Sequence, residues 1–256
     1  RQADPRRPLF AAASARGKER AAWICLSAGA CGWALGETFW AYRALVGGEK
    51  PFPSWADAGF ATFLLGAALC LGFLLLAHPV EVQLRLALDG LIVGAALFGA
   101  AWVTLLDPVY AARVSSPAAT ALALAYPTVD IALIAMAALM LIRAPVARRP
   151  ALAALTAGLV LITLSDTAFA YLTGVGAVHG THVIAIGWAW GFLCLGIAAL
   201  VTRTARSAAV HPAQSAARAA LWLPYMAVVV SAAICTPVLF GGLGPVYVAA
   251  VLTVFA

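Results

Sequence analysis

Residues 33–42 read WALGETFWAY and residues 163–171 read TLSDTAFAY, so an acid, a threonine, an alanine and a tyrosine recur in the same order. The two acids, Glu37 and Asp166, stand 129 residues apart, each inside a long apolar run. A carboxylate near the middle of a membrane helix costs about 2.5–3.5 kcal/mol, so it usually faces the protein interior and serves a function. These acids therefore indicate where the interior of the molecule lies.

The composition is that of a membrane protein. Hydrophobic residues make up 64% of the chain and charged residues only 10%, with a mean hydropathy of +0.97. A soluble domain with so few charges would precipitate, whereas a bundle of membrane helices has this balance. The net charge of +6 could suggest nucleic acid, but the basic residues lie in short loops between apolar runs. Membrane topology explains them better, so we expect the lipid bilayer and no nucleic acid as a partner.

Apolar runs of about 20 residues, the length that spans a bilayer, predict an all-α bundle of about eight transmembrane helices. A basic tail, residues 1–20, precedes them. This tail and the loops on its side together carry 13 Lys and Arg, against 3 in the alternate loops, which predicts that both ends are cytoplasmic. We expect a multi-pass protein of the bacterial inner membrane. The runs lie near 21–45, 54–77, 83–106, 117–142, 151–173, 181–202, 219–240 and 244–256.

The recurring acid motif predicts an internal repeat. The offset of 129 residues places the first predicted helix on the fifth. The two copies are four helices apart in the chain, so both run from inside to outside. We therefore expect a parallel repeat of four plus four helices, related by an axis along the membrane normal.

Four acids are predicted to lie in the outer half of the bundle, and aromatic side chains share their helix faces. Acids and aromatics on one face can form the wall of a pocket. The aromatic residues have an alternative role as interface anchors or packing. The predicted ligand-binding residues are Glu37, Trp40, Asp57, Tyr126, Asp130, Asp166, Tyr171 and Trp188.

Several acids also have a structural explanation. Asp57 follows a serine at a predicted helix start, where a carboxylate caps free N–H groups. Asp89 lies one turn from Arg85, which predicts a structural ion pair within one helix. Asp130 could bond backbone disturbed by Pro127, which has no N–H. Glu37 and Asp166 have no cation within a turn, so these acids must hold protons, share one, or face water or a cation.

No catalytic motif or cofactor site is recognisable. The five cysteines include no C-x-x-C, and the four histidines sit at span ends, so neither a metal site nor a haem site is indicated. A P-loop, a G-x-S-x-G elbow and an H-E-x-x-H motif are also missing from the sequence. The cofactor is unknown, and enzymatic activity is not assigned to these residues. A homodimer or a larger membrane complex is an open possibility.

Four motifs together resemble the multi-helix N-terminal membrane region of actinobacterial signalling proteins, notably GGDEF/EAL cyclic-di-GMP enzymes and some sensor kinases. The resemblance implies a sensory input module whose output domain follows Ala256. The family often has an acid before Gly-Trp in the sixth helix, where this chain has Ile186. The motifs are PFPSWADAGF (51–60), LDG (88–90), AYPTVD (125–130) and LSDTAFAY (164–171).

The sequence thus predicts an integral membrane module that reads a ligand, a cation or pH through an outward-facing acidic and aromatic pocket. A proton- or cation-coupled transporter is the alternative, because repeats and acids at mid-membrane depth also occur in carriers. An accessory subunit of a larger complex is a third reading.

The charge distribution makes a testable prediction about topology. A reporter fused after residue 20 and another fused after residue 210 should both report a cytoplasmic location. An activity assay of paired inside-active and outside-active reporters measures this. An outside location at either position would overturn the helix count or the charge assignment.

Overall fold

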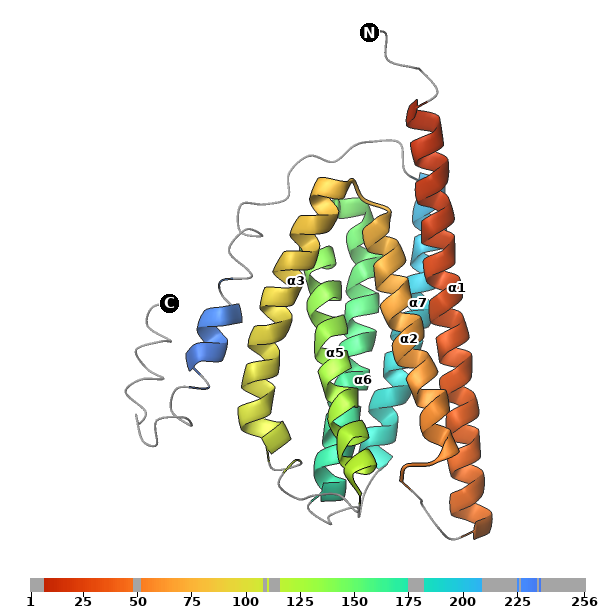
Figure 1. Cartoon of the computed structure of the whole chain (residues 1–256). Helices are drawn as coiled ribbons and strands as arrows, with labels where there is room; N and C mark the ends of the chain where they lie inside the picture. Colours follow the sequence, from red (N-terminus) through yellow and green to blue (C-terminus); the bar gives the residue numbers. More distant parts are fainter. Residues whose placement is uncertain are drawn as a thin grey trace. The chain divides into compact units, whose positions relative to one another are not determined.

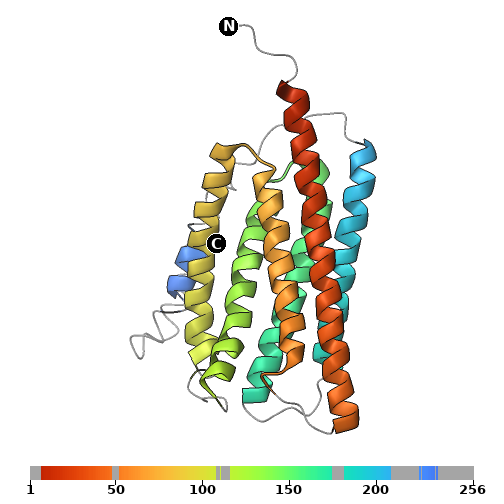
Figure 2. The same cartoon turned by 45° about the vertical axis from the view of Figure 1, so that its right-hand side comes forward.

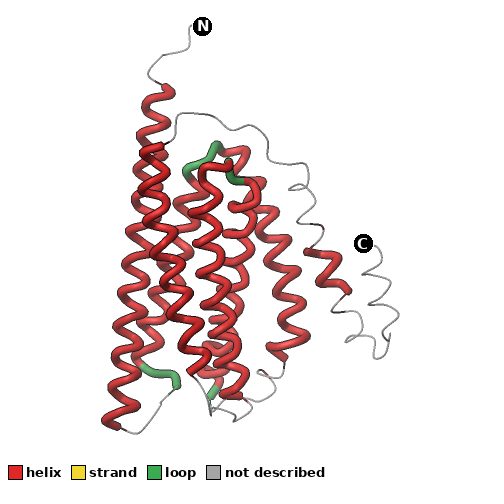
Figure 3. The backbone as a smooth tube through the Cα atoms, turned by 180° about the vertical axis from the view of Figure 1, so that it is seen from behind, coloured by secondary structure: helices red, strands yellow, loops and turns green. Residues whose placement is uncertain are grey.

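The computed structural model describes residues 7–47, 52–107, 110, 116–174, 182–208, 225, 227–233 and 235. All regular structure among these residues is helical (Figure 3). The chain divides into two compact units, Arg1–Ala87 and Leu88–Ala256, with the division inside one helix. Each unit is described in turn below.

Two long helices form the first unit. Helix α1 spans Arg7–Tyr42 and ends in a π-helical turn, η1, at Arg43–Gly47. Helix α2 spans Trp55–Leu76, and Figures 1 and 2 show the two helices side by side along their length. Residues 7–20, which were predicted as part of a basic tail before the first helix, are therefore the beginning of α1 itself. Alanine and arginine, which dominate this stretch, are strong helix formers.

Glycines set the close approach of α1 and α2. A Cβ atom built at Gly59 would lie 2.6 Å from the carbonyl oxygen of Gly32 and 2.7 Å from Cα of Gly36. One built at Gly66 would lie 2.9 Å from Cα of Gly29. Small residues let helix backbones meet in this way, and the resulting van der Waals packing holds membrane helices together.

Polar side chains bond the backbone at the turn between α2 and the next helix, α3 (Val80–Ala101). The Lys18 ammonium donates to the carbonyl oxygen of Leu76 at 2.7 Å. The Gln83 amide donates to the carbonyl oxygen of His78 at 2.6 Å. The last carbonyl groups of α2 lack partners within the helix, so a cation there also suits the helix dipole.

The second unit holds the rest of α3, the π-helical turn η2 (Trp102–Leu106) and three further long helices. These are α5 (Pro117–Arg143), α6 (Arg149–Gly174) and α7 (His182–Ala208), with a 3₁₀ turn, η3 (Val146–Arg148), between α5 and α6. Helix α5 packs against α6, and α6 packs against α7. Gly90 of α3 faces the side chain of Met136 on α5.

Among the residues that the structure describes, five helices are long and apolar enough to cross a membrane, which confirms the prediction of a helical membrane protein. Helix α1 forms where the first span was predicted but is not among the five, since charged and polar residues dilute its apolar content. The predicted spans at 219–240 and 244–256 lie mostly outside the described residues. The five are Trp55–Leu76, Val80–Thr104, Pro117–Arg143, Val146–Phe169 and Ile184–Arg203.

The glycine contact predicts a difference between two substitutions in α2. Gly59→Ala should destabilise the protein by about 1–3 kcal/mol, the usual effect of overpacking, because the new methyl group meets backbone atoms of α1. Gly72→Ala is the matched control, since nothing lies within 4 Å of a Cβ built there. It should be neutral or stabilising. Thermal unfolding in detergent tests the pair, and equal melting temperatures would contradict the glycine contact.

Candidate functional site

Three neighbouring helices of the second unit bring two acids and one indole together. Asp130 lies on α5, Asp166 on α6 and Trp188 on α7. Each lies within a helix that can cross a membrane. The sequence predicted all three as site residues, and the structure places them in one cluster, here called the acid pair with its indole donor.

Trp188 is the hydrogen-bond donor of the cluster. Its Nε1–H donates to Oδ1 of Asp166 at 2.7 Å, and its ring packs against Phe169 with the ring centroids 5.8 Å apart. The Phe169 ring holds the indole from α6, one turn beyond Asp166. Sequence reasoning missed Phe169, although its i+3 spacing from Asp166 placed it on the same helix face.

Asp130 completes the acid pair from α5. Its side chain is buried, with 2% of its surface exposed, and its carboxyl group interacts directly with that of Asp166. Its Oδ2 atom has no hydrogen-bond partner among the described residues. The predicted alternative, a bond to backbone freed by Pro127, is not made at Oδ2 and stays a prediction for the other oxygen.

Small residues let α7 come close enough to α6 for the hydrogen bond from Trp188 to Asp166. Ser165 Oγ lies against Gly187, and a Cβ built at Gly158 would lie 2.8 Å from the carbonyl oxygen of Gly191. The Ser165 hydroxyl itself donates to the carbonyl oxygen of Leu161 in its own helix at 2.9 Å. It is therefore bonded within α6, which leaves the indole as the donor to Asp166.

The electrostatics of the cluster require a positive counterpart. Among the described residues of α5, α6 and α7, the basic side chains sit at helix ends, and Arg143 forms an ion pair with Asp89. Two carboxylates in contact cannot both stay ionised in an apolar interior without a counter-charge. The acid pair can therefore share one proton or hold a cation.

The Asp89–Arg143 ion pair corrects the predicted partner of Asp89. The sequence predicted Arg85, one turn away on the same helix, but the Asp89 carboxylate pairs with Arg143 of α5. Arg85 is exposed. The ion pair with Arg143 is partly buried, because only 18% of the Asp89 side chain and 14% of the Arg143 side chain are exposed.

The other predicted residues are not part of the acid pair. Glu37 and Trp40 are half-buried on α1, in the first unit, and Glu37 has no hydrogen bond or ion pair to a described residue. Asp57 has the predicted capping role: its Oδ2 accepts from the Ser54 N–H at 2.6 Å. Tyr126 is half-buried on α5. Tyr171 lies in α6, but its side chain lies outside the described residues.

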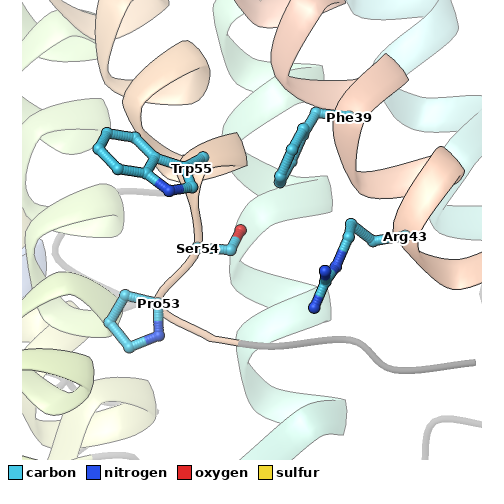
Figure 4. A pocket seen from close by; sticks show the side chains of 5 residues that line it. All are labelled: Phe39, Arg43, Pro53, Ser54 and Trp55. Atoms are coloured by element: carbon cyan, nitrogen blue, oxygen red, sulfur yellow. The ribbon is translucent and has the colours of Figure 1, made fainter. Parts of the chain in front are cut away.

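A pocket that sequence reasoning missed lies in the first unit, between the end of α1 and the start of α2 (Figure 4). Its volume is about 570 Å³. Its lining combines a cation, two aromatic rings and a hydroxyl group, from Phe39, Arg43, Pro53, Ser54 and Trp55.

The indole bond yields a prediction with a close control. Trp188→Phe keeps the ring contact but removes the N–H donor to a buried carboxyl group, so it should lower stability by about 1–3 kcal/mol. Trp190→Phe, two residues along the same helix and 57% exposed, should change stability little. Thermal unfolding of both variants in lipid nanodiscs measures the difference. Equal effects of the two substitutions would mean that the Trp188 bond contributes nothing.

Comparison with known proteins finds no relative for this chain: no family model, curated protein or solved structure matches it.

Proposed function

We propose that this chain is a membrane-embedded sensory module in which the acid pair of Asp130 and Asp166 detects protons or a cation. The observation that carries the proposal is that two carboxyl groups from different helices interact at a buried position within an apolar bundle. Sequence resemblance to the membrane regions of GGDEF/EAL proteins and sensor kinases points in the same direction.

Binding of a proton or a cation by the acid pair determines how closely the helices pack. With one shared proton, the two carboxyl groups attract each other through a hydrogen bond and hold α5 against α6. Loss of that proton leaves two negative charges in contact in a medium of low dielectric constant, and the repulsion drives the helices apart unless a cation binds. The bond from Trp188 to Asp166 connects this movement to α7. Helix movement of this kind can transmit the signal to a cytoplasmic output domain.

We also propose that the helix pairs α1·α2 and α6·α7 are copies of one unit. The support comes from their contacts. A Cβ built at Gly29 would lie 2.9 Å from the carbonyl oxygen of Thr62, and the residues 129 positions later, Gly158 and Gly191, make the same contact at 2.8 Å. This is the offset that relates Glu37 to Asp166. The two copies differ at the donor, because Gly59 stands where the second copy has Trp188.

Proton binding at the acid pair predicts a pH dependence of stability. The bound proton stabilises the folded state, so wild-type stability should fall as pH rises from about 5 to about 8 and the proton is lost. Asp130→Asn and Asp166→Asn each delete one charge at nearly constant size, so each should flatten this dependence and raise stability at the alkaline end. Melting temperatures across this range measure the effect.

The control is Glu81→Gln, which removes an exposed carboxylate in the first turn of α3 and should keep the wild-type pH dependence. An infrared signal from protonated carboxyl groups should be present in the wild type at neutral pH and should change in both Asn variants. Identical melting of all variants at every pH would mean that the acids are structural. Proton uptake by vesicles containing the protein would favour the transporter alternative instead.

A further inference from the structure

The pocket of the first unit combines groups from two helices and the turn between them. Phe39 lies one helical turn before Arg43, which begins the π-helical turn η1. Pro53, Ser54 and Trp55 lead into α2 from the other side. Figure 4 shows the Phe39 and Arg43 side chains directed from α1 toward the Ser54 and Trp55 segment. A volume of about 570 Å³ is within the range of about 300–1,000 Å³ typical of small-ligand sites.

The position of the pocket along α2 gives its depth in a bilayer. Trp55 is the first residue of a helix long and apolar enough to cross a membrane, Trp55–Leu76, so the pocket is expected at the level where acyl chains meet headgroups. The Trp55 side chain is 82% exposed. Tryptophan is enriched at this level, because its ring suits the boundary between acyl chains and headgroups. A ligand of this pocket is therefore expected to combine a polar head with apolar chains.

The charges around the pocket favour an anionic head. Arg43 supplies a guanidinium group with five N–H donors, so it can keep its interaction within the chain and still bind a phosphate. The Ser54 oxygen accepts from the Ala56 N–H at 3.2 Å, and its own hydroxyl proton stays available to a ligand. The arginine and the hydroxyl together can bind two phosphate oxygens.

The helix cap argues for a lipid and against a free anion. Asp57 and Ser54 already bond each other's groups and the Ala56 N–H at the start of α2, so the helix terminus is satisfied by the chain itself. The carboxylate also offsets the positive end of the helix dipole. A small free anion would therefore bind only Arg43 and the Ser54 hydroxyl, whereas a lipid also gains apolar contact with Phe39 and Trp55.

We propose that the pocket lined by Phe39, Arg43, Ser54 and Trp55 binds the phosphate group of an anionic membrane phospholipid. The Arg43 guanidinium binds the phosphate, and the two aromatic rings contact the glycerol and the first acyl carbons. This site is separate from the acid pair and does not depend on the function proposed for that pair.

Lipid retention by the purified full chain tests the site. Native mass spectrometry after reconstitution with phosphatidylglycerol should detect a retained lipid on the wild type. Arg43→Gln should reduce its retention by at least about tenfold, the effect of losing a charge-assisted hydrogen bond. Arg85→Gln, an exposed arginine outside the pocket, is the matched control and should retain the lipid as the wild type does.

Two further arms separate the remaining outcomes. Inorganic phosphate added in large excess should leave the lipid in place, and displacement by phosphate would show a free-anion site and overturn the lipid proposal. Arg43→Lys keeps the charge but loses the planar fork, so retention should fall between wild type and Arg43→Gln. If Arg43→Gln fails to fold, full wild-type retention of the lipid by Arg43→Lys would by itself overturn the proposal. Wild-type retention by Arg43→Lys and Arg43→Gln alike would overturn the proposal.

Discussion

A membrane interior contains no water, so each polar group within it must find a partner in the protein, and the second unit depends on this constraint. The hydroxyl groups of Thr163 and Ser165 donate to carbonyl oxygens of their own helix. The Asp89 carboxylate pairs with Arg143, and the indole of Trp188 donates to Asp166. After these bonds are made, the described residues leave the contact between Asp130 and Asp166 without a positive partner. That remaining demand for a proton or a cation is the physical basis of the proposed sensing.

Glycine contacts make these bonds reachable. Lipid chains are as apolar as leucine, so membrane helices gain little from hydrophobic association and depend on close packing. In the second unit, Gly158 and Gly191 let α6 and α7 pack closely, so that the Trp188 indole can reach Asp166. In the first unit, Gly36 and Gly59 bring the backbones of α1 and α2 into contact. Close packing thus determines which helices can form a hydrogen bond with each other.

Apolar runs predicted the helices well, because the length and hydrophobicity of a span are properties of the local sequence. The predicted run 117–142 became α5, Pro117–Arg143, and the predicted run 54–77 became α2, Trp55–Leu76. Neighbour relations between helices are not encoded locally in this way. The sequence placed Asp130 and Asp166 in the same half of the bundle, but nothing in it said that α5 lies beside α6 with the two carboxyl groups in contact. The same limit explains why Asp89 was paired with Arg85 and not with Arg143.

The proposed repeat gives a physical reason why only one copy has an indole donor. Gly59 on α2 and Trp188 on α7 lie at equivalent positions of the proposed repeat, 129 residues apart. In the first pair, a Cβ at Gly59 would already meet the backbone of Gly32 and Gly36, so an indole cannot be accommodated there. In the second pair, the contact is made one residue earlier, at Gly187 against Ser165, which leaves Trp188 beside it and within reach of Asp166. On the proposed repeat, the first pair uses this position for backbone packing and the second uses it to bond Asp166.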